Sequence, residues 1–272
     1  MDADRTRWTR WRRLSQFTVA LFYLLLPFVH RLDFHAVAGN LASLRIGPLD
    51  LNEPAATASA VFASRELTWP LAIGTLPVVL LALILGPVFC SWVCPWGLLS
   101  EGIDRIRQHL RPSAWSAAGW QRLRRPRALI LTGFLLLSLS SATPLIALFS
   151  APRLISTLPL EAIFLKAISP VTGGLLLVLL LLEILGPRRL WCRALCPVGI
   201  LNGYLRTRRT ASIHFSADRC YCPHTPICQT ACGWGIDPRH ILTFDGCTNC
   251  LACVGQCPST ALRFQLKPHS IA

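Results

Sequence analysis

Four apolar stretches alternate with polar and charged segments along the chain. They are Leu14–Val29, Pro70–Cys90, Ala128–Phe149 and Pro170–Gly186. A helix that crosses a hydrocarbon core of about 30 Å needs roughly 20 mostly apolar residues, so each stretch predicts a membrane-spanning helix, the first one extended by its flanks. No small-residue cleavage site follows Leu14–Val29, so we expect a retained helix and not a cleaved signal peptide.

The composition agrees with this pattern. Of the 272 residues, 53% are hydrophobic and 15% are charged, and the mean hydropathy is +0.47. A soluble domain of this length seldom combines so much apolar sequence with so few charges. We therefore expect a multi-pass protein of the bacterial cytoplasmic membrane, in preference to a soluble protein with long core helices.

Arginines gather before the first apolar stretch and between the second and the third. The two groups are Arg5, Arg7, Arg10, Arg12 and Arg13, and Arg105, Arg107, Arg111, Arg122, Arg124, Arg125 and Arg127. The connections on the opposite side hold five basic residues that acidic residues balance. Because short segments rich in Lys and Arg stay in the cytoplasm, we expect both termini there.

The formal net charge of +14 also raises the question of a nucleic-acid partner. Clustered basic residues neutralise phosphates, but these arginine tracts adjoin the apolar stretches, and only two of the basic residues are lysines. Topology and anionic lipid headgroups account for tracts in this position. We therefore expect no nucleic-acid partner.

Two stretches of the sequence repeat each other, from Ile84 to Leu99 and from Ile184 to Leu201. Each has Ile-Leu-Gly-Pro, then an aromatic residue before a C-x3-C-P motif, then a glycine two residues after the proline. The second copy carries two extra residues before its aromatic residue. So many matched positions indicate that a two-helix unit was duplicated, and each unit ends in a C-x3-C-P turn.

The composition changes at Ala211. Short β-prone runs alternate there with dense Cys and Pro, namely Ser212–Phe215, His240–Phe244 and Ala261–Leu266. We expect a basic cytoplasmic N-terminus over residues 1–13, an all-α four-helix membrane core over 14–210, and a small α+β ferredoxin-like domain over 211–272. A unit of this size is marginal on apolar burial alone, and bound metal clusters would add stability.

The C-terminal segment carries the most specific motif of the chain. Its cysteines follow the pattern C-x2-C-x2-C-x3-C-P and are Cys247, Cys250, Cys253 and Cys257. This run holds [4Fe–4S] clusters in bacterial ferredoxins, where three cysteines bind one cluster and the fourth binds the other. We therefore expect two [4Fe–4S] clusters in this domain.

A second set of cysteines precedes that motif with a less regular spacing, C-x-C-x5-C-x3-C. Its members are Cys220, Cys222, Cys228 and Cys232. By the same crossed pattern, one cluster would use Cys220, Cys222, Cys228 and Cys257, and the other Cys232, Cys247, Cys250 and Cys253. Disulfides would need an oxidising compartment, which a cytoplasmic segment lacks, and zinc ribbons show separated C-x2-C pairs instead of two quartets.

The cysteines of the repeat are candidate catalytic residues. They are Cys90 and Cys94 in the first copy, and Cys192 and Cys196 in the second. A buried cysteine is often only a small apolar side chain, but matched pairs at two helix ends favour a function. The four could ligate a metal or a cluster together, or act as dithiols.

Three further residues bear on the membrane chemistry. Glu183 lies inside the fourth apolar stretch, where it could accept a proton from a quinol or extend towards the headgroups from a helix end. His30 and His35 could bind haem, but they adjoin charged residues at a helix exit. A solvated boundary explains the two histidines better.

With these motifs in view, the chain resembles the ferredoxin-type membrane proteins of the NapH and MauN kind, whose relatives include the membrane core of NosR. The run from Phe89 to Pro95, Phe-Cys-Ser-Trp-Val-Cys-Pro, is especially similar to NapH. The resemblance implies oxidation of membrane quinol, with electrons passed to a periplasmic reductase or maturation system. The implied partners are the quinol pool and a ferredoxin-type or cytochrome protein, in nitrate reduction or in methylamine dehydrogenase formation.

The favoured function is therefore a quinol dehydrogenase component that conducts electrons. An assembly factor whose thiols handle metal or disulfides for a maturing periplasmic enzyme is the main alternative. A transporter with a regulatory cluster domain fits less well, because the apolar stretches have almost no polar residues to line a path.

Overall fold

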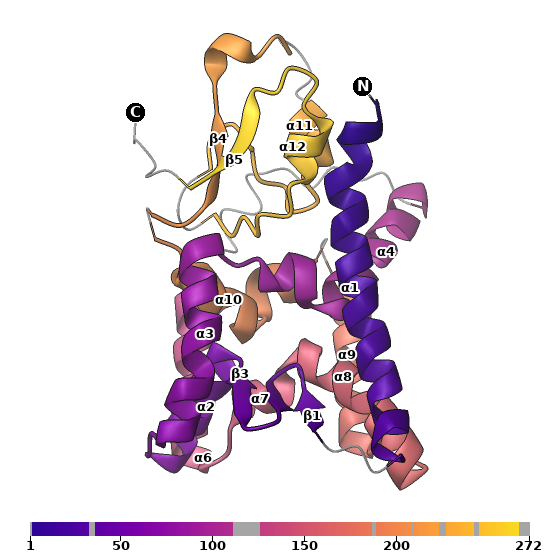
Figure 1. Ribbon diagram of the computed structural model, residues 1–272, viewed down its shortest axis with the longest axis vertical. Helices are drawn as coiled ribbons and strands as arrows, with labels where there is room; N and C mark the ends of the chain where they lie inside the picture. The colour runs from indigo at the N-terminus through magenta and orange to yellow at the C-terminus, as the bar shows by residue number, and fades with distance from the viewer. Residues whose placement is uncertain are drawn as a thin grey trace.

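The computed structural model describes residues 2–32, 36–110, 126–186, 189–207, 209–222, 227–241 and 245–266. This part of the chain is mostly helical. Figure 1 shows a body of helices with the cysteine-rich segment at one end, and the start of α1 (Asp2–His30) lies at that same end. The arginine-rich beginning of the chain and the cysteine-rich segment therefore share one side.

The helices of the body come from two regions of the sequence. After α1, the first region contributes α2 (Pro54–Ser64), α3 (Trp69–Leu85), the π-helical turn η1 (Phe89–Val93) and α4 (Pro95–Leu110). The second contributes α6 (Arg127–Ser141), α7 (Leu145–Phe149), α8 (Ala151–Leu160), the π-helical turn η2 (Glu161–Leu165), α9 (Pro170–Leu185), the π-helical turn η3 (Trp191–Leu195) and α10 (Pro197–Tyr204). Helices α3 and α9 each lead into a C-x3-C-P turn, as expected for duplicated units.

The four apolar stretches form helices of unequal length. Among the described residues, one helix is both long and apolar enough to cross a membrane, Arg7–His30 within α1. Helices α3, α6 and α9 are apolar but shorter, with 17, 15 and 16 residues. Their lengths alone do not establish a four-helix membrane core, which stays a prediction.

The third stretch is not the single helix expected over residues 128–149. Helix α6 ends at Ser141, Ala142 adopts a left-handed φ of 50°, and α7 begins only at Leu145. Pro144 explains the break, because proline disfavours the helical conformation of the residue before it and lacks an amide hydrogen. The second stretch also ends early, at Gly86 with a φ of 81°.

A segment between α1 and α3 folds back into the body. Strands β1 (Val37–Asn40), β2 (Ser43–Ile46) and β3 (Leu49–Asn52) form an antiparallel meander in which Ala38 pairs with Arg45 and Leu44 with Leu51. Helix α2 then packs against α6, α7 and α10. It carries small buried residues, Ala55, Ala56, Thr57 and Ser59, and small side chains let helices approach closely.

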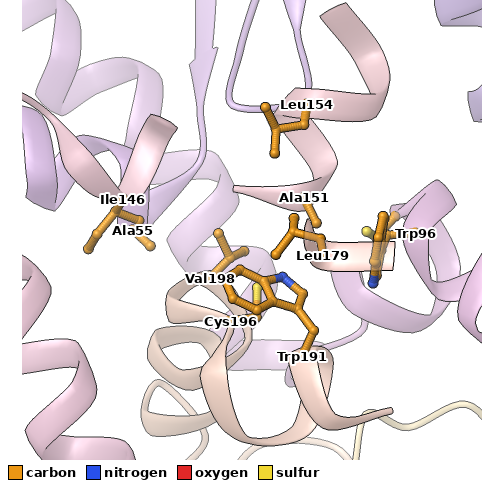
Figure 2. Close-up of a cluster of buried hydrophobic side chains, with 10 residues drawn as sticks. Ala55, Trp96, Ile146, Ala151, Leu154, Leu179, Trp191, Cys196 and Val198 are labelled. Carbon is orange, nitrogen blue, oxygen red and sulfur yellow. The ribbon is translucent and has the colours of Figure 1, made fainter. Parts of the chain in front are cut away.

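The buried core of the body lies between the two repeated units. Its side chains are Ala55, Cys94, Trp96, Ile146, Ala151, Leu154, Leu179, Trp191, Cys196 and Val198. Figure 2 shows Cys196 at the ring of Trp191, with Val198 on one side of the ring in this view and Leu179 and Ala151 on the other. Two cysteines of the C-x3-C-P motifs are thus part of the most buried region of the body.

The C-terminal segment has its own small core. Strands β4 (Ser212–Phe215) and β5 (Leu262–Gln265) pair antiparallel, with η4 (Ala217–Arg219), α11 (Ile227–Ala231) and α12 (Ala252–Gln256) between them. The first and third β-prone runs are confirmed as strands. His240 and Ile241 are not in a strand, and residues 242–244 lie outside the described residues.

Candidate redox site

The two C-x3-C-P motifs adopt the same backbone conformation. In η1 the amide of Cys94 donates to the carbonyl of Phe89 at 2.9 Å, and in η3 the amide of Cys196 donates to that of Trp191 at 2.7 Å. A helix starts directly after each motif, at the proline that follows the second cysteine. Proline suits a first helical position because its missing amide hydrogen would have no partner there.

A glycine two residues after each proline lets the motif fold tightly. A Cβ atom on Gly97 would lie 2.7 Å from the carbonyl oxygen of Cys90, and one on Gly199 would lie 3.1 Å from that of Cys192. The Sγ atom of Cys90 lies 3.9 Å from the Cβ position of Gly199. The first cysteine of one copy therefore sits against the second copy.

The structure brings the four repeat cysteines together. Cys90 is close enough to Cys94 and Cys196 for their charges to interact, and Cys192 is likewise close to the other three. Burial raises the pKa of the Cys94 thiol to about 11 and that of the Cys196 thiol to about 12. The two buried thiols therefore hold their protons at neutral pH unless a bound group or an oxidation removes them.

Glu183 is buried among these groups, with its side chain held by both copies of the repeat. The hydroxyl of Ser100 on α4 donates to Glu183 Oε1, and the Trp191 amide donates to Oε2 at 3.3 Å. Its exposed fraction is 1%, so it does not extend to the surface. Its charge interacts with Cys192.

A second buried carboxylate, Glu53, also lies near the thiols. It caps α2, since Oε2 accepts the Ala56 amide at 2.8 Å, and its charge interacts with Cys90 and Cys196. Burial raises the pKa of Glu53 to about 7. The sequence does not mark Glu53 as a candidate because the segment that follows it is of mixed polarity. The signal that could have found it is Glu-Pro before a run of small residues, which is typical of a helix start.

The first motif is fastened to the C-terminal segment. The Ser91 hydroxyl donates to Thr248, and the Trp92 indole donates to the Asn249 carbonyl at 3.2 Å. The Asn249 side chain donates in turn to the carbonyl of Leu85 at 2.7 Å. The turn that carries Cys247 and Cys250 is thereby fixed against the end of α3.

The second motif links the two cores through Cys192. That side chain packs against the core of the body and also against the core of the C-terminal segment. Next to it, Arg189 forms an ion pair with Asp104 at 2.9 Å and lies 5.4 Å from the Trp234 ring centre. Within the described part of the chain, Cys192 therefore connects the two cores directly.

The interface also contains a charged cavity of about 330 Å³, with Cys250 among its lining residues. Arg12 and Arg13 at the start of α1 both donate to Glu101 on α4, at 2.5 and 2.8 Å. Burial would raise the pKa of Glu101, but the two arginines outweigh it and lower the pKa to about 2. Glu101 is therefore a fixed negative charge, and sequence reasoning gave no sign of it.

Within the C-terminal segment, the cysteines lie in two neighbourhoods. Cys232 is close to Cys247 and Cys250, and Cys253 is close to all three. Cys228 is close to Cys257, and the charge of Arg239 acts on both Cys228 and Cys220. Cys222 is half-buried, and residues 223–226 that follow it lie outside the described residues.

The chemistry of these thiols fits iron–sulfur clusters. Burial raises the pKa of Cys232 to about 11 and also raises those of Cys247 and Cys253. Such thiols ionise when they gain a metal partner. Among the described residues, no three His, Cys, Asp or Glu side chains are arranged to hold a metal ion, and thiols around a cubane stand farther apart because each binds a different iron.

The histidines considered for haem take no part in either neighbourhood. The Nε2 atom of His30 lies 2.6 Å from the carbonyl oxygen of Val37, at the end of α1. His35 lies outside the described residues.

Comparisons with known proteins match the body of the chain to an iron–sulfur family. A family described as a 4Fe-4S binding domain matches residues 67–113 and 169–212, which are the two copies of the repeat. No solved structure gives a significant match.

Curated relatives match across most of the sequence. The methylamine utilization ferredoxin-type protein MauN of Methylobacillus flagellatus is 31% identical over 224 residues, which are 79% of this chain and 74% of the relative. The ferredoxin-type protein NapH of Haemophilus influenzae is 26% identical over 273 residues, 96% of this chain and 90% of the relative. The putative electron transport protein YccM of Escherichia coli is 26% identical over 280 residues, which are 95% of this chain and 76% of the relative. This chain therefore belongs to the family of NapH- and MauN-type ferredoxin-like proteins.

Proposed function

We propose that this protein oxidises quinol in the bacterial cytoplasmic membrane and passes the electrons through two [4Fe–4S] clusters. A partner ferredoxin-type or cytochrome protein would carry them towards a periplasmic reductase or maturation system. The matched 4Fe-4S binding domain supports iron–sulfur chemistry. The names of relatives, electron transport and methylamine utilization, support electron transfer in such a system.

The apolar surface of the helices supports a multi-pass membrane protein. Large apolar side chains point outwards on all four apolar helices, among them Phe17, Leu24, Ile73, Leu80, Leu129, Leu136, Val171 and Leu177. Such a band would be unfavourable in water but suits lipid. The grouping of the arginines with the cysteine-rich end supports cytoplasmic termini. A reporter inserted at Gly47, in the turn between β2 and β3, should then be active only as a periplasmic reporter.

The ligand sets of the clusters follow the two thiol neighbourhoods. One cluster would be held by Cys232, Cys247, Cys250 and Cys253, and the other by Cys220, Cys222, Cys228 and Cys257. When bound, each cluster supplies a one-electron acceptor. The chain tunes one of them with positive charge, since Arg206 donates to the carbonyl of Cys247 at 3.4 Å and the charge of Arg189 interacts with Cys250. Positive charge near a cluster favours its reduced form.

The contact of Cys192 with both cores is the observation that carries this proposal. Electron transfer needs donor and acceptor groups close together, and this side chain adjoins both the other repeat cysteines and the packed C-terminal core. The four repeat cysteines then serve as the part of the path nearest the quinol, and Glu183 accepts a proton beside them.

The alternative, an assembly factor, is favoured by one observation. Four thiols from two copies of a repeat meet in a buried place, which could hold a metal in transit as well as an electron path. The two functions differ in whether quinol drives reduction of the clusters.

The test uses purified protein with its iron, kept free of oxygen, and adds a soluble quinol. The expected result is quinol-dependent bleaching of the broad visible absorption of oxidised [4Fe–4S] clusters, with about eight irons per chain. Reduction by dithionite serves as the control for intact clusters. Clusters that dithionite reduces and quinol does not would reject the quinol dehydrogenase and favour the assembly factor.

A further inference from the structure

The charged cavity between the two regions lies where several parts of the chain meet. Its wall comes from the start of α1, from α4, from the turn before η3 and from α11 and α12. In Figure 1 the start of α1 lies beside α12. The volume of about 330 Å³ is at the lower end of the roughly 300–1,000 Å³ found for small-molecule sites. The cavity is therefore large enough for a small ligand.

Positive charge prevails in the wall of this cavity. The charged side chains that line it are Arg12, Arg13, Arg105, Arg189, Glu101 and Asp104. Asp104 is paired with Arg189 at 2.9 Å, and these two charges cancel. Glu101 accepts hydrogen bonds from all three other arginines, but one carboxylate cannot neutralise three guanidinium groups. The wall therefore carries an excess of two positive charges.

The arginines that share Glu101 keep donors for a further partner. A guanidinium group has five N–H donors, whereas Arg12 and Arg105 each donate to Glu101 through one nitrogen, Nη2. Arg12 is 6% exposed, and its buried Nε atom has no hydrogen-bond partner in the part of the chain that the structure describes. A buried donor is costly to leave without an acceptor. A bound anion would supply one.

Two arginines make the cavity accessible from outside. The side chains of Arg13 and Arg105 are 41% and 49% exposed, whereas that of Arg12 is 7% exposed. The hydroxyl-bearing side chain of Thr9 on α1 also lines the cavity. An anion that passes the two outer arginines would reach inner donors. This arrangement differs from an open basic surface, where every charge is solvated.

The cavity is separate from the proposed cluster sites. Cys250 lines it, but the wall that the described residues form does not include Cys232, Cys247 or Cys253, the cysteines proposed to share a cluster with Cys250. A space that receives a cubane is lined by all of its ligands, since each thiolate binds one iron. A ligand of the cavity would therefore lie beside a cluster and would not replace it.

We propose that this cavity is a binding site for a phosphate monoester. Such a group carries a charge of about −1.5 to −2 at pH 7, which matches the excess of two positive charges. It also has three strong acceptor oxygens, and arginine binds phosphate oxygens through parallel hydrogen bonds. The buried Arg12 would hold the group from inside, and Arg13 and Arg105 would hold it from the open side.

The place of the cavity along α1 favours the headgroup of a membrane lipid as the source of the phosphate. Arg12 lies next to Trp8 and Trp11, which are 42% and 55% exposed, and just before the exposed apolar side chain of Leu14. Exposed tryptophans gather at the membrane–water interface, and basic pockets on the cytoplasmic side bind anionic headgroups. The choice of source rests on the proposed membrane location, whereas binding of the phosphate does not.

The test measures binding to the full chain with its iron in detergent. One probe is short-chain phosphatidic acid, a lipid whose headgroup is a phosphate monoester. The other is glycerol 3-phosphate, which is the same headgroup without acyl chains and therefore represents the soluble source. Phosphatidylcholine of equal chain length, which has no net charge, is the control lipid. Native mass spectrometry counts the bound molecules, and titration calorimetry gives their affinities.

A pair of double variants tests the arginines of the wall. Arg13→Gln combined with Arg105→Gln removes the two outer charges and leaves Glu101 its buried partner. The matched control combines Arg7→Gln with Arg10→Gln, which removes the same charge from α1. Arg7 and Arg10 line a different hollow of the surface. The iron content of each variant verifies that it has folded.

A third variant tests the cavity without changing any charge. Thr9→Leu places a larger apolar side chain in the wall, and leucine suits a helix better than threonine. The change therefore reduces the space for a ligand while α1 stays intact. It keeps the site testable even if the double variant of Arg13 and Arg105 does not fold.

We expect one phosphatidic acid molecule to bind per chain, more tightly than phosphatidylcholine. The double variant of Arg13 and Arg105 should weaken this binding by about 10- to 100-fold, as expected when hydrogen bonds between charged groups are lost. Thr9→Leu should also lose affinity, whereas the control double variant should bind like the wild type. Glycerol 3-phosphate that binds with the same dependence on these residues would support the site and assign it to a soluble ligand.

Three results would overturn the inference. They are failure of both phosphate probes to bind the wild type, equal weakening in the two double variants, and wild-type affinity in both cavity variants. Since none of these measurements uses quinol, they are independent of the test of the proposed function.

Discussion

The chain holds its cysteines in two ways. In the C-terminal segment the cysteines are close in sequence, and short loops turn them towards one another. In the body, Cys90 and Cys94 meet Cys192 and Cys196 only because two repeated units pack face to face. The first arrangement depends on local spacing, and the second depends on the whole fold.

This difference predicts where each region gets its stability. The C-terminal core contains Cys247 and Cys253 among few apolar side chains, so bound clusters should supply much of its folding energy. The core of the body is filled by large apolar side chains such as Trp96, Leu154 and Trp191. Loss of a thiol should therefore unfold the C-terminal segment. In the body, it should stop electron transfer without unfolding the helices.

The largest effect is expected in the C-terminal segment. Cys253→Ala removes a proposed cluster ligand and should cost about half of the iron, with destabilisation of that segment. Iron analysis and limited proteolysis measure both. A stoichiometric zinc content in the wild type, or full iron in Cys253→Ala, would contradict the cluster assignment.

A loss of electron delivery without loss of iron is expected in the body. Cys94→Ala and Cys196→Ala should each slow quinol-driven cluster reduction at least about tenfold. Because residues that act as one unit are not additive, the double variant should be little slower than either single variant. Independent, multiplying effects would mean that the four thiols do not work together.

Substitutions at the interface between the two regions should have effects of intermediate size. Arg189→Gln leaves Asp104 without its buried ion-pair partner, which costs about 3–5 kcal/mol, and removes a positive charge near Cys250. The potential of one cluster should become more negative in a redox titration. Arg45→Gln breaks the exposed pair with Asp50 and should cost under about 1 kcal/mol. Equal losses of stability in the two variants would show that the buried ion pair at the interface contributes no more than the exposed pair.

The smallest effects test the close packing of the motifs. Gly199→Ala brings a methyl group 3.1 Å from the Cys192 carbonyl, whereas Gly203→Ala on the same helix meets no atom within 4 Å. We expect Gly199→Ala to lower the free energy of unfolding by about 1–3 kcal/mol. Gly203→Ala should be neutral or stabilising by up to about 1 kcal/mol. Thermal melts of the pair in detergent compare them, and the reverse order would show that the turn has spare room.

The two regions also differ in how well the sequence predicted them. The spacing of Cys247, Cys250 and Cys253 indicates a cluster because local chain geometry alone turns those thiols together. The meeting of the repeat cysteines depends on tertiary packing, so the pattern favoured a function and left its nature open. The repeat could be recognised from the sequence alone. The two segments that match the 4Fe-4S binding domain are its two copies.

Other features of the fold were not predicted, for physical reasons that the structure makes clear. The break after Ser141 was signalled by Pro144, but the length of the apolar stretch outweighed it. Helix α2 looked like an external connection because its Ala, Ser and Thr residues have little hydropathy of their own. Such small residues become core only against particular neighbours, and Glu53 was overlooked together with them.

The contact of Cys192 with both cores can be tested directly. Quinol-driven and dithionite-driven reduction of the clusters would be measured in Cys192→Ala and in Val198→Ala, a change in the same core that keeps every thiol. We expect Cys192→Ala to keep its iron and its dithionite reduction but to lose quinol-driven reduction, whereas Val198→Ala should keep its iron and both kinds of reduction. Wild-type quinol-driven rates in Cys192→Ala would contradict the proposal that electrons cross between the two regions at this thiol.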